Sequence, residues 1–312
     1  MKTLSLFLSA GLLALTPSLA SAKIERTVEK TFTVQPGGKL KVHTQGGDIK
    51  VVTGAAPTVK VVAREVIRAS SDAEADELLK KLTLVIEQNA DGVAATAEYE
   101  KSAGFHWGSW PPVQVGFTVT VPASYNVELK TSGGDVTVDD LQGNVHARTS
   151  GGDIVLGKIA GDVHAGTSGG DVRLAEGRGS VKLGTSGGDI QVGRVVGPAD
   201  LDTSGGDIRV DAVEGTLHAD TSGGDVKATL TGPLKGDCRL GTSGGKVTAV
   251  VEKSVAFDLD ASTSGGDVSA TGLTITIDKG GVGRSRLAGK VNGGGPLLKL
   301  RTSGGNIRIE PR

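Results

Sequence analysis

The chain has 312 residues, with 34 basic and 35 acidic side chains, so its formal charge is close to zero. This balance gives no electrostatic reason to expect nucleic acid or an anionic membrane as a partner. Forty-nine glycines and only 3% aromatic residues favour a repeated architecture of short strands and tight turns over a bulky core. The single cysteine, Cys238, excludes an intramolecular disulfide.

The first 22 residues have the pattern of an export signal. Lys2 supplies a positive charge, an apolar stretch runs from Leu4 to Leu15, and residues 20–22 form an Ala-Ser-Ala cleavage site. The apolar stretch is too short to span a bilayer, and no later segment is long and apolar enough for a transmembrane helix. We therefore predict a signal peptide over residues 1–22 and a location in the periplasm, on the cell surface or outside the cell.

Residues 23–125 are predicted to form an N-terminal β region with one short helix. Aliphatic residues alternate around the loose motif 44–48, which resembles a first coil, and further strands are expected over 59–66 and 82–86. A helix is expected from Ser71 to about Lys81, with Ser70 or Ser71 as its N-cap and acidic residues in its first turn. We expect this region to cap one end of a repeated array and cover its open strand edge.

Both tryptophans lie in one segment of this N-terminal region. Glycine and proline predict a loop there, and aromatic residues on loops are typical of binding patches. The alternative is that the two tryptophans pack over the end of the array. The candidate ligand-binding residues are Phe105, His106, Trp107 and Trp110.

The tetrapeptide Thr-Ser-Gly-Gly recurs nine times and organises residues 126–312. Its copies begin at Thr131, Thr149, Thr167, Thr185, Thr203, Thr221, Thr242, Thr263 and Thr302. The first six copies are 18 residues apart, the next two steps are 21 residues, and the last is 39. A fixed period in this range predicts a solenoid, and we expect a degenerate repeat around Ile275 to Leu287 in the wide gap.

Within each period the aliphatic residues alternate in two short runs. Val136 and Val138, for example, become Ile154 and Leu156 one period later, which predicts two strands per coil. A left-handed hexapeptide helix also has 18 residues per turn, but it needs an aliphatic residue every six, and Gln142 stands six residues after Val136. An antiparallel meander remains the alternative. Equal periods favour an all-β parallel solenoid, in which identical residues stack at the strand spacing of ~4.8 Å.

An aspartate follows most Gly-Gly pairs and forms a column of like charges in a parallel stack, which needs some compensation. One interpretation is a calcium site, as in secreted β-rolls, although their nine-residue repeats place aspartate at both corners. The other is a turn role, in which each carboxylate accepts hydrogen bonds from backbone N–H groups. Lys246 and Asn306 at the same position favour the turn. The column comprises Asp135, Asp153, Asp171, Asp189, Asp207, Asp225 and Asp267, with Asp48 in the loose copy.

Other candidate sites have simpler interpretations. His146, His164 and His218 share one outward column, in which neighbouring histidines could share a metal but a solvated face is the better interpretation. Cys238 falls in an aliphatic column and is predicted to be buried. The threonine column is expected to form a hydrogen-bonded ladder along the stack and not an ice-binding array.

No pattern in the sequence indicates catalysis. The corners have four or five residues, too few to wall a substrate cleft of the kind that polysaccharide lyases on parallel β-helices possess. No nucleophile motif or metal-ligand spacing is present. We therefore predict that the protein is not an enzyme and needs no cofactor, with calcium as the one alternative.

Three features resemble a bacterial putative adhesin family of unknown function, related to GIN-type adhesin head domains. They are the pattern Phe-x-Val-x-Pro-Gly-Gly-x-Leu over residues 32–40, the Val121-Pro122 step, and the serial Thr-Ser-Gly-Gly-Asp motifs. The resemblance implies a β-solenoid at or near the cell surface and defines no catalytic residues. We expect an exported scaffold or adhesin-like module that binds a surface glycan or an envelope protein. The alternatives are a calcium-ordered β-roll and a carbohydrate-active enzyme.

Overall fold

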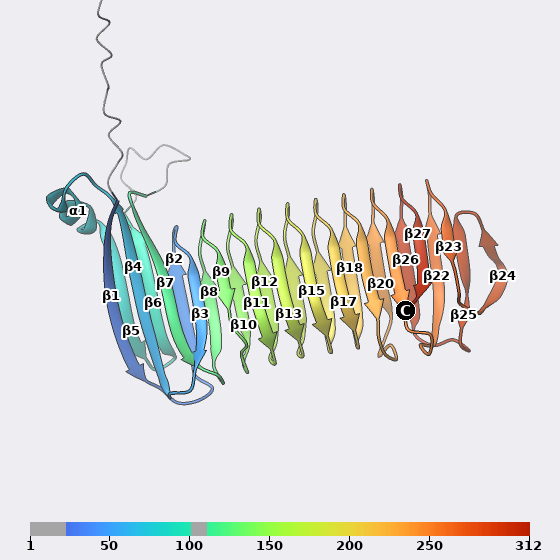
Figure 1. The fold of residues 1–312 in the computed structure, drawn as a ribbon, viewed down its shortest axis with the longest axis horizontal. Coiled ribbons are helices and arrows are strands. Elements are labelled where there is room, and N and C mark those ends of the chain that lie inside the picture. Colours follow the sequence, from blue (N-terminus) through green and yellow to red (C-terminus); the bar gives the residue numbers. More distant parts are fainter. Residues whose placement is uncertain (1–22, 101–110) are drawn as a thin grey trace, which may run out of the picture.

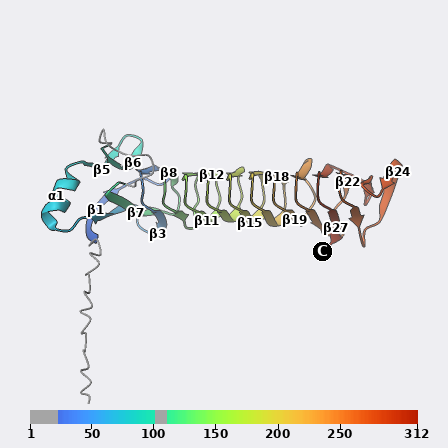
Figure 2. The same ribbon diagram turned by 90° about the horizontal axis from the view of Figure 1, so that it is seen from above.

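The computed structural model describes residues 23–100 and 111–312, and these form an elongated molecule made of two long β-sheets (Figure 1). Sheet A has 13 strands and sheet B has 14, and the two sheets lie face to face along the whole array (Figure 2). The predicted all-β solenoid is therefore confirmed. The predicted signal peptide and the four aromatic-loop candidates lie outside the described residues.

Each regular coil contributes one strand to each sheet. Sheet A receives β9 (Val136–Val138), β11 (Ile154–Ile159), β13 (Val172–Gly177), β15 (Ile190–Val195), β17 (Ile208–Val213), β19 (Val226–Leu230) and β21 (Val247–Val251). Sheet B receives β8 (Asn126–Lys130), β10 (Val145–Arg148), β12 (Val163–Gly166), β14 (Val181–Gly184), β16 (Pro198–Asp202), β18 (Thr216–Thr221) and β20 (Cys238–Thr242).

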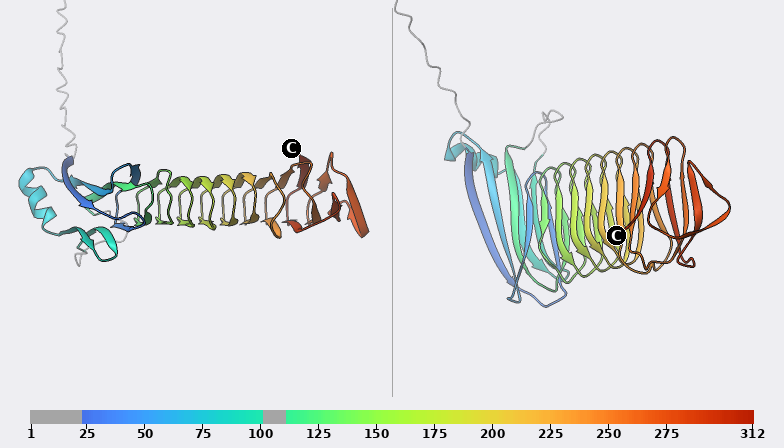
Figure 3. Two further views of the ribbon diagram at one scale, coloured as in Figure 1. Left: turned by 90° about the horizontal axis from the view of Figure 1, so that it is seen from below. Right: turned by 45° about the vertical axis from the view of Figure 1, so that its right-hand side comes forward.

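Neighbouring strands in this array are parallel and keep the register that the repeat predicts. Ile154 pairs with Val172 in sheet A, and Val145 pairs with Val163 in sheet B, each one period further along the chain. The antiparallel meander is thereby excluded for the array. The side views show the coils stacked one on another at regular intervals (Figure 3).

The interior is a thin layer of aliphatic side chains that alternate with outward-facing polar ones. Ile190 and Val192 of sheet A and Leu183 of sheet B are at most 2% exposed. Cys238 is 1% exposed in the same layer, as predicted, and burial raises the pKa of its thiol. Because the layer runs through every coil, each coil buries its apolar face against its neighbours.

The Thr-Ser-Gly-Gly corner links successive coils by hydrogen bonds. The Thr185 hydroxyl donates to the carbonyl of Gly170 in the preceding coil at 2.8 Å and accepts from the N–H of Gly188 at 3.3 Å. The second glycine of the motif is needed because of close approach: a Cβ on Gly188 would lie 2.1 Å from the Gly170 oxygen. The same threonine bond recurs in every copy, which explains why the motif repeats so strictly.

The N-terminal region contributes the first coil and then extends both sheets beyond it. The first coil is β2 (Lys39–Thr44) and β3 (Ile49–Gly54), which pair in parallel with β8 and β9. Sheet A continues through β7 (Val113–Pro122), β4 (Thr58–Arg68) and β1 (Lys23–Thr33), and sheet B through β6 (Gly92–Tyr99) and β5 (Leu82–Asn89). Pairs β1–β4, β4–β7 and β5–β6 are antiparallel.

The one helix, α1 (Asp72–Leu79), lies at this end of the molecule. Ser71 is its N-cap, as predicted, since its hydroxyl accepts from the Glu74 N–H at 3.2 Å. The Glu74 carboxylate in turn accepts from the Ser70 N–H at 2.8 Å. This reciprocal pairing satisfies donors that the first turn leaves open.

The C-terminal end differs from the sequence prediction. Strands β22 (Phe257–Thr263) and β23 (Val268–Ala270) follow β21 in the chain. In the stack, however, the last coil, β26 (Leu297–Thr302) and β27 (Ile307–Pro311), is inserted before them: β26 lies between β20 and β22, and β27 lies between β21 and β23. The chain segment that connects β23 to β26 contains β24 (Ile275–Gly283) and β25 (Arg286–Val291). These two strands form an antiparallel hairpin at the end of the stack, and it extends sheet B past β22. The predicted degenerate repeat around Ile275 to Leu287 is wrong, because this segment caps the array and the chain then returns into it.

Candidate functional site

The aspartate column lies at the corner that follows Gly-Gly, and its carboxylates bind the next coil. The Asp171 Oδ1 accepts the N–H of Asp189 at 2.8 Å, and the Asp189 Oδ1 accepts that of Asp207 at 2.7 Å. The ladder runs from Asp48 to Lys246, and Asn306 supplies the acceptor for Asp267. A repulsive column is thus made compatible with parallel stacking because each carboxylate accepts a backbone N–H of the next turn.

Cations occupy some of the second carboxylate oxygens in this column. Arg173 bridges Asp153 and Asp171, at 3.3 and 2.6 Å, and Lys246 lies 3.4 Å from Asp225. Over residues 23–100 and 111–312, no three His, Cys, Asp or Glu side chains converge in a way that would hold a metal ion. The hydrogen bonds from carboxylate to backbone N–H give the column the geometry of a turn element.

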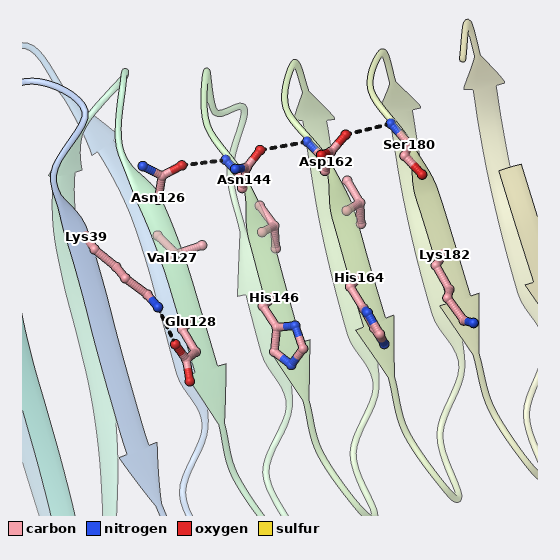
Figure 4. Close-up of a pocket in the computed structure, with 12 residues that line it drawn as sticks. Lys39, Asn126, Val127, Glu128, Asn144, His146, Asp162, His164, Ser180 and Lys182 are labelled. Atoms are coloured by element: carbon pink, nitrogen blue, oxygen red, sulfur yellow. Dashed lines mark hydrogen bonds and ion pairs between the residues drawn. The ribbon is translucent and has the colours of Figure 1, made fainter. Parts of the chain in front are cut away.

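A polar hollow lies on the outer face of sheet B, over strands β8, β10, β12 and β14 (Figure 4). Its volume is about 660 Å³. We call it the sheet-B groove. It is lined by Lys39, Asn126, Val127, Glu128, Asn144, Val145, His146, Asp162, Val163, His164, Ser180 and Lys182.

The floor of the sheet-B groove is a row of side chains in direct register. Glu128, His146, His164 and Lys182 occupy equivalent positions on four neighbouring strands. The predicted histidine column is thus confirmed as a row on the sheet, and its first two imidazole rings lie with centroids 4.8 Å apart. Lys39 reaches Glu128 from β2, at 2.5 Å between Nζ and Oε2.

Both histidines of the groove hold their protons less tightly than a free imidazole. Burial is the main cause for His146, and the positive charge of Arg148 lowers its pKa further. Burial is also the main cause of the lowered pKa of His164, and the positive charges of His146 and Arg148 lower this pKa further. The neighbouring Glu128 has a lowered pKa because it accepts a hydrogen bond from Lys39. At neutral pH the groove therefore presents two uncharged imidazoles between charged neighbours.

One edge of the groove is a second side-chain ladder. The Asn126 Oδ1 accepts the N–H of Asn144 at 3.0 Å, the Asn144 Oδ1 accepts that of Asp162 at 2.9 Å, and the Asp162 Oδ1 accepts that of Ser180 at 2.8 Å (Figure 4). These bonds fix the edge rigidly. Asn126 also donates its Nδ2 to the carbonyls of Gly37 and Gly38, at 3.0 and 3.3 Å. The ladder leaves Asn144 Nδ2, Asp162 Oδ2 and Ser180 Oγ unused, and these atoms can face a ligand.

A second hollow of about 380 Å³ adjoins the groove, and His164 and Lys182 line both. We call it the glycine slot, because Gly166 and Gly184 form its floor. Arg148 lies beyond Gly166, and Asp202 lies beyond Gly184, in one row of register partners. Burial raises the pKa of Asp202, and the nearby Asp200 and Asp220 raise it further.

The sequence identified part of this site. The outward histidine column was predicted with its correct members, but as a solvated face and not as the floor of a hollow. The glycine slot was missed. Its signal was available, since Gly166 and Gly184 stand where neighbouring repeats carry Arg148 and Asp202.

The fold and this site define the class of the protein: a parallel β-solenoid with two strands per coil and a polar hollow on one sheet face. A family model described as Toastrack DUF4097 matches residues 118–310, which is more than half of the chain. The chain belongs to this family. The expected resemblance to a putative adhesin family of unknown function is thereby confirmed.

A comparison with solved structures matches nearly the whole chain, at low identity and with TM-scores below 0.5. A putative adhesin from Bacteroides fragilis is 13% identical, with 91% of this chain and 97% of that chain covered and a TM-score of 0.40. A putative adhesin from Parabacteroides distasonis is 11% identical, with 92% and 97% covered and a TM-score of 0.39. A putative lipid binding protein from the same species is 12% identical, with 91% and 96% covered and a TM-score of 0.31.

These likenesses assign no ligand and no activity to this chain. A comparison with curated proteins found no significant match. Among the described residues, no helix has the length and apolar character that crossing a membrane requires.

Proposed function

We propose that the protein is an exported, non-catalytic solenoid of the bacterial envelope, which binds a surface glycan or a protein partner through the outer face of sheet B. The observation that carries the proposal is the sheet-B groove with its adjoining slot. There, polar side chains of four coils converge at fixed register on a rigid surface. Rigid elements hold binding groups with little loss of entropy when a ligand arrives.

The arrangement favours binding over catalysis. The groove is an open depression on a flat sheet, and catalytic sites work by excluding water around the reacting atoms. Its histidines face one another and Lys182. Ser180 is the one serine that lines the groove, and among the described residues no hydrogen bond joins its hydroxyl to an imidazole. Export is supported by the signal pattern over residues 1–22.

A matched pair of charge reversals tests the proposal. Lys182 on sheet B and Arg209 on sheet A have nearly equal side-chain exposure, 59% and 58%, and each has one carboxylate partner. The assay measures retention of the purified protein on envelope fragments of the producing bacterium. Lys182→Glu is expected to reduce retention at least about tenfold, the scale of one charge-assisted contact, whereas Arg209→Glu retains it.

Equal retention by wild type and both variants would contradict the placement of the binding face. Reduced retention of both variants would show that the net charge of the protein, and not the sheet-B groove, controls retention. Far-ultraviolet circular dichroism confirms that each variant is folded, which is expected because both side chains point to solvent.

A further inference from the structure

The backbone conformation does not explain why glycine occupies both positions in the floor of the glycine slot. Neither Gly166 nor Gly184 has the left-handed conformation that favours glycine. A Cβ on Gly166 would lie 3.5 Å from its nearest neighbour and one on Gly184 would lie 3.8 Å away, both ordinary contacts. Glycine in a strand often marks a close approach by a ligand or by another backbone. These two glycines leave an open floor where a side chain would fit.

The two ends of the slot carry opposite charges. Arg148, Gly166, Gly184 and Asp202 are successive register partners, so the outer strands are about 14 Å apart, or three strand spacings. Among the described residues, no carboxylate oxygen lies within 4.0 Å of Arg148, so its guanidinium is free to meet an anion. His164 and Lys182 form one wall and add further donors. The slot therefore offers the Arg148 cation at one end, the donors of His164 and Lys182 along one wall, and the Asp202 carboxylate at the other end.

The lining fits a sugar better than a peptide. The strands of this region are paired on both sides, so an extended peptide finds no open edge to join. The apolar lining residues Val127, Val145 and Val163 are each 2% exposed and belong to the core, so their side chains offer little surface to an apolar anchor. Sugar hydroxyls can donate to Asp202 and Asp162, and the open glycine floor leaves room for a sugar ring.

We propose that the glycine slot and the adjoining groove bind an anionic sugar unit, whose acid group lies against Arg148, His164 and Lys182 and whose hydroxyls face Asp202. The inference rests on the proposed function, because it names the ligand class of the same face. Carboxylate and phosphate groups share this recognition chemistry. A glycan with such a unit at intervals could occupy the groove and the slot together.

The histidine pair makes this binding pH-dependent. His146 faces Glu128 of β8, Lys39 of β2 and His164 of β12, with Arg148 on its own strand. His164 faces His146 and Arg148 of β10 and Lys182 of β14, with Asp162 on its own strand. A bound anion favours the protonated imidazoles, so affinity is expected to rise as the pH falls through the lowered pKa values of the two histidines.

Calorimetric titration of the purified protein tests the proposal with four probes. Trigalacturonate supplies carboxylates, glucose 6-phosphate supplies a phosphate, and trigalacturonate methyl ester and glucose are the uncharged controls. We expect one or both anionic probes to bind and the controls to bind at least about tenfold more weakly. The two anionic arms distinguish a carboxylate from a phosphate ligand.

Four variants locate the site. Gly184→Leu fills the slot without a backbone clash and Arg148→Ala removes its cation, and each is expected to weaken binding at least about tenfold. The controls on sheet A are Gln191→Leu, which adds an exposed leucine, and Lys227→Ala, which removes an exposed cation. Both are expected to bind like wild type, and the melting temperature of each variant reports its folding.

The outcomes separate this inference from the proposed function. Failure of both anionic probes at millimolar concentration, equal binding of the charged and uncharged probes, or undiminished binding by Gly184→Leu overturns the anionic-sugar site. The proposed function survives those results if Lys182→Glu still releases the protein from envelope fragments. It fails separately if that variant is retained.

Discussion

Two adjacent glycines of one corner provide a sharp test of the stacked-coil structure. Neither Gly187 nor Gly188 has a positive φ angle, so alanine is compatible with both backbones. A Cβ on Gly187 would lie 3.5 Å from its nearest neighbour, whereas one on Gly188 would lie 2.1 Å from the Gly170 oxygen. Gly188→Ala is therefore expected to open the stack, and Gly187→Ala is the matched control.

The cost of Gly188→Ala follows from the bonds that the opening breaks. Moving the contact from 2.1 to 3.0 Å, the shortest distance that real Cβ atoms show, separates the coils locally by 0.9 Å. The hydrogen bonds that cross this corner include three made by the side chains and N–H groups of residues 185–189: Thr185 to Gly170 at 2.8 Å, Asp189 to Asp171 at 2.8 Å, and Gly187 to Ser168 at 3.1 Å. Each would exceed 3.5 Å. At about 1 kcal/mol for each bond, the loss is about 3 kcal/mol.

Thermal unfolding followed by circular dichroism measures this difference. A loss of about 3 kcal/mol lowers the melting temperature of a chain of this size by roughly 5–10 °C, and Gly187→Ala should change it by less than about 2 °C. Midpoints are compared directly, because arrays of repeats depart from two-state unfolding. Equal midpoints for the two variants would refute the close approach of parallel coils at this corner.

Three further predictions concern ions, protons and the aromatic segment. Millimolar calcium is expected to leave the melting temperature unchanged, because the column carboxylates already accept N–H bonds; a clear rise over a sample in chelator would restore the calcium interpretation. His146→Gln is expected to raise the pKa of His164 toward its ordinary value of 6.5, since the charge of His146 lowers it; an unchanged imidazole titration by NMR would contradict this. Replacing Trp107 and Trp110 with alanine is predicted to reduce retention on envelope fragments, and wild-type retention would remove that segment from the binding surface.

Much of the array could be predicted from the sequence because its period fixes its register. Once positions are counted from the threonine of each motif, the inward column containing Cys238 and the outward column containing His146 and His164 follow directly. The carboxylate ladder is also a consequence of equal periods, since the same side chain meets the same N–H in each coil. Repetition turns local patterns into long-range contacts.

The ends of the array could not be predicted in this way. The gap of 39 residues between Thr263 and Thr302 has the length of one coil of 18 and one of 21, yet it contains a hairpin and a return of the chain between two earlier coils. Sequence spacing counts residues but does not say which coil becomes the neighbour. That choice depends on tertiary packing, in which β26 buries Leu298 and Leu300 beside β20.

The glycine slot depends on the absence of side chains at Gly166 and Gly184, and the repeat pattern alone does not reveal such a feature. An outward glycine looks like a neutral surface position when each repeat is considered alone. Two such glycines side by side, Gly166 and Gly184, become a slot only when the register places them between Arg148 and Asp202. Parallel stacking therefore converts two unremarkable positions into a shaped surface.

Hydroxyl-radical footprinting of the protein on envelope fragments tests most directly whether the outer face of sheet B is the binding surface. Imidazole and indole rings both react with the radical, so one experiment compares the groove with the aromatic segment. We expect protection of His146 and His164 on binding, with His218 further along the same row remaining reactive. Protection confined to Trp107 and Trp110, or to side chains of sheet A, would contradict it.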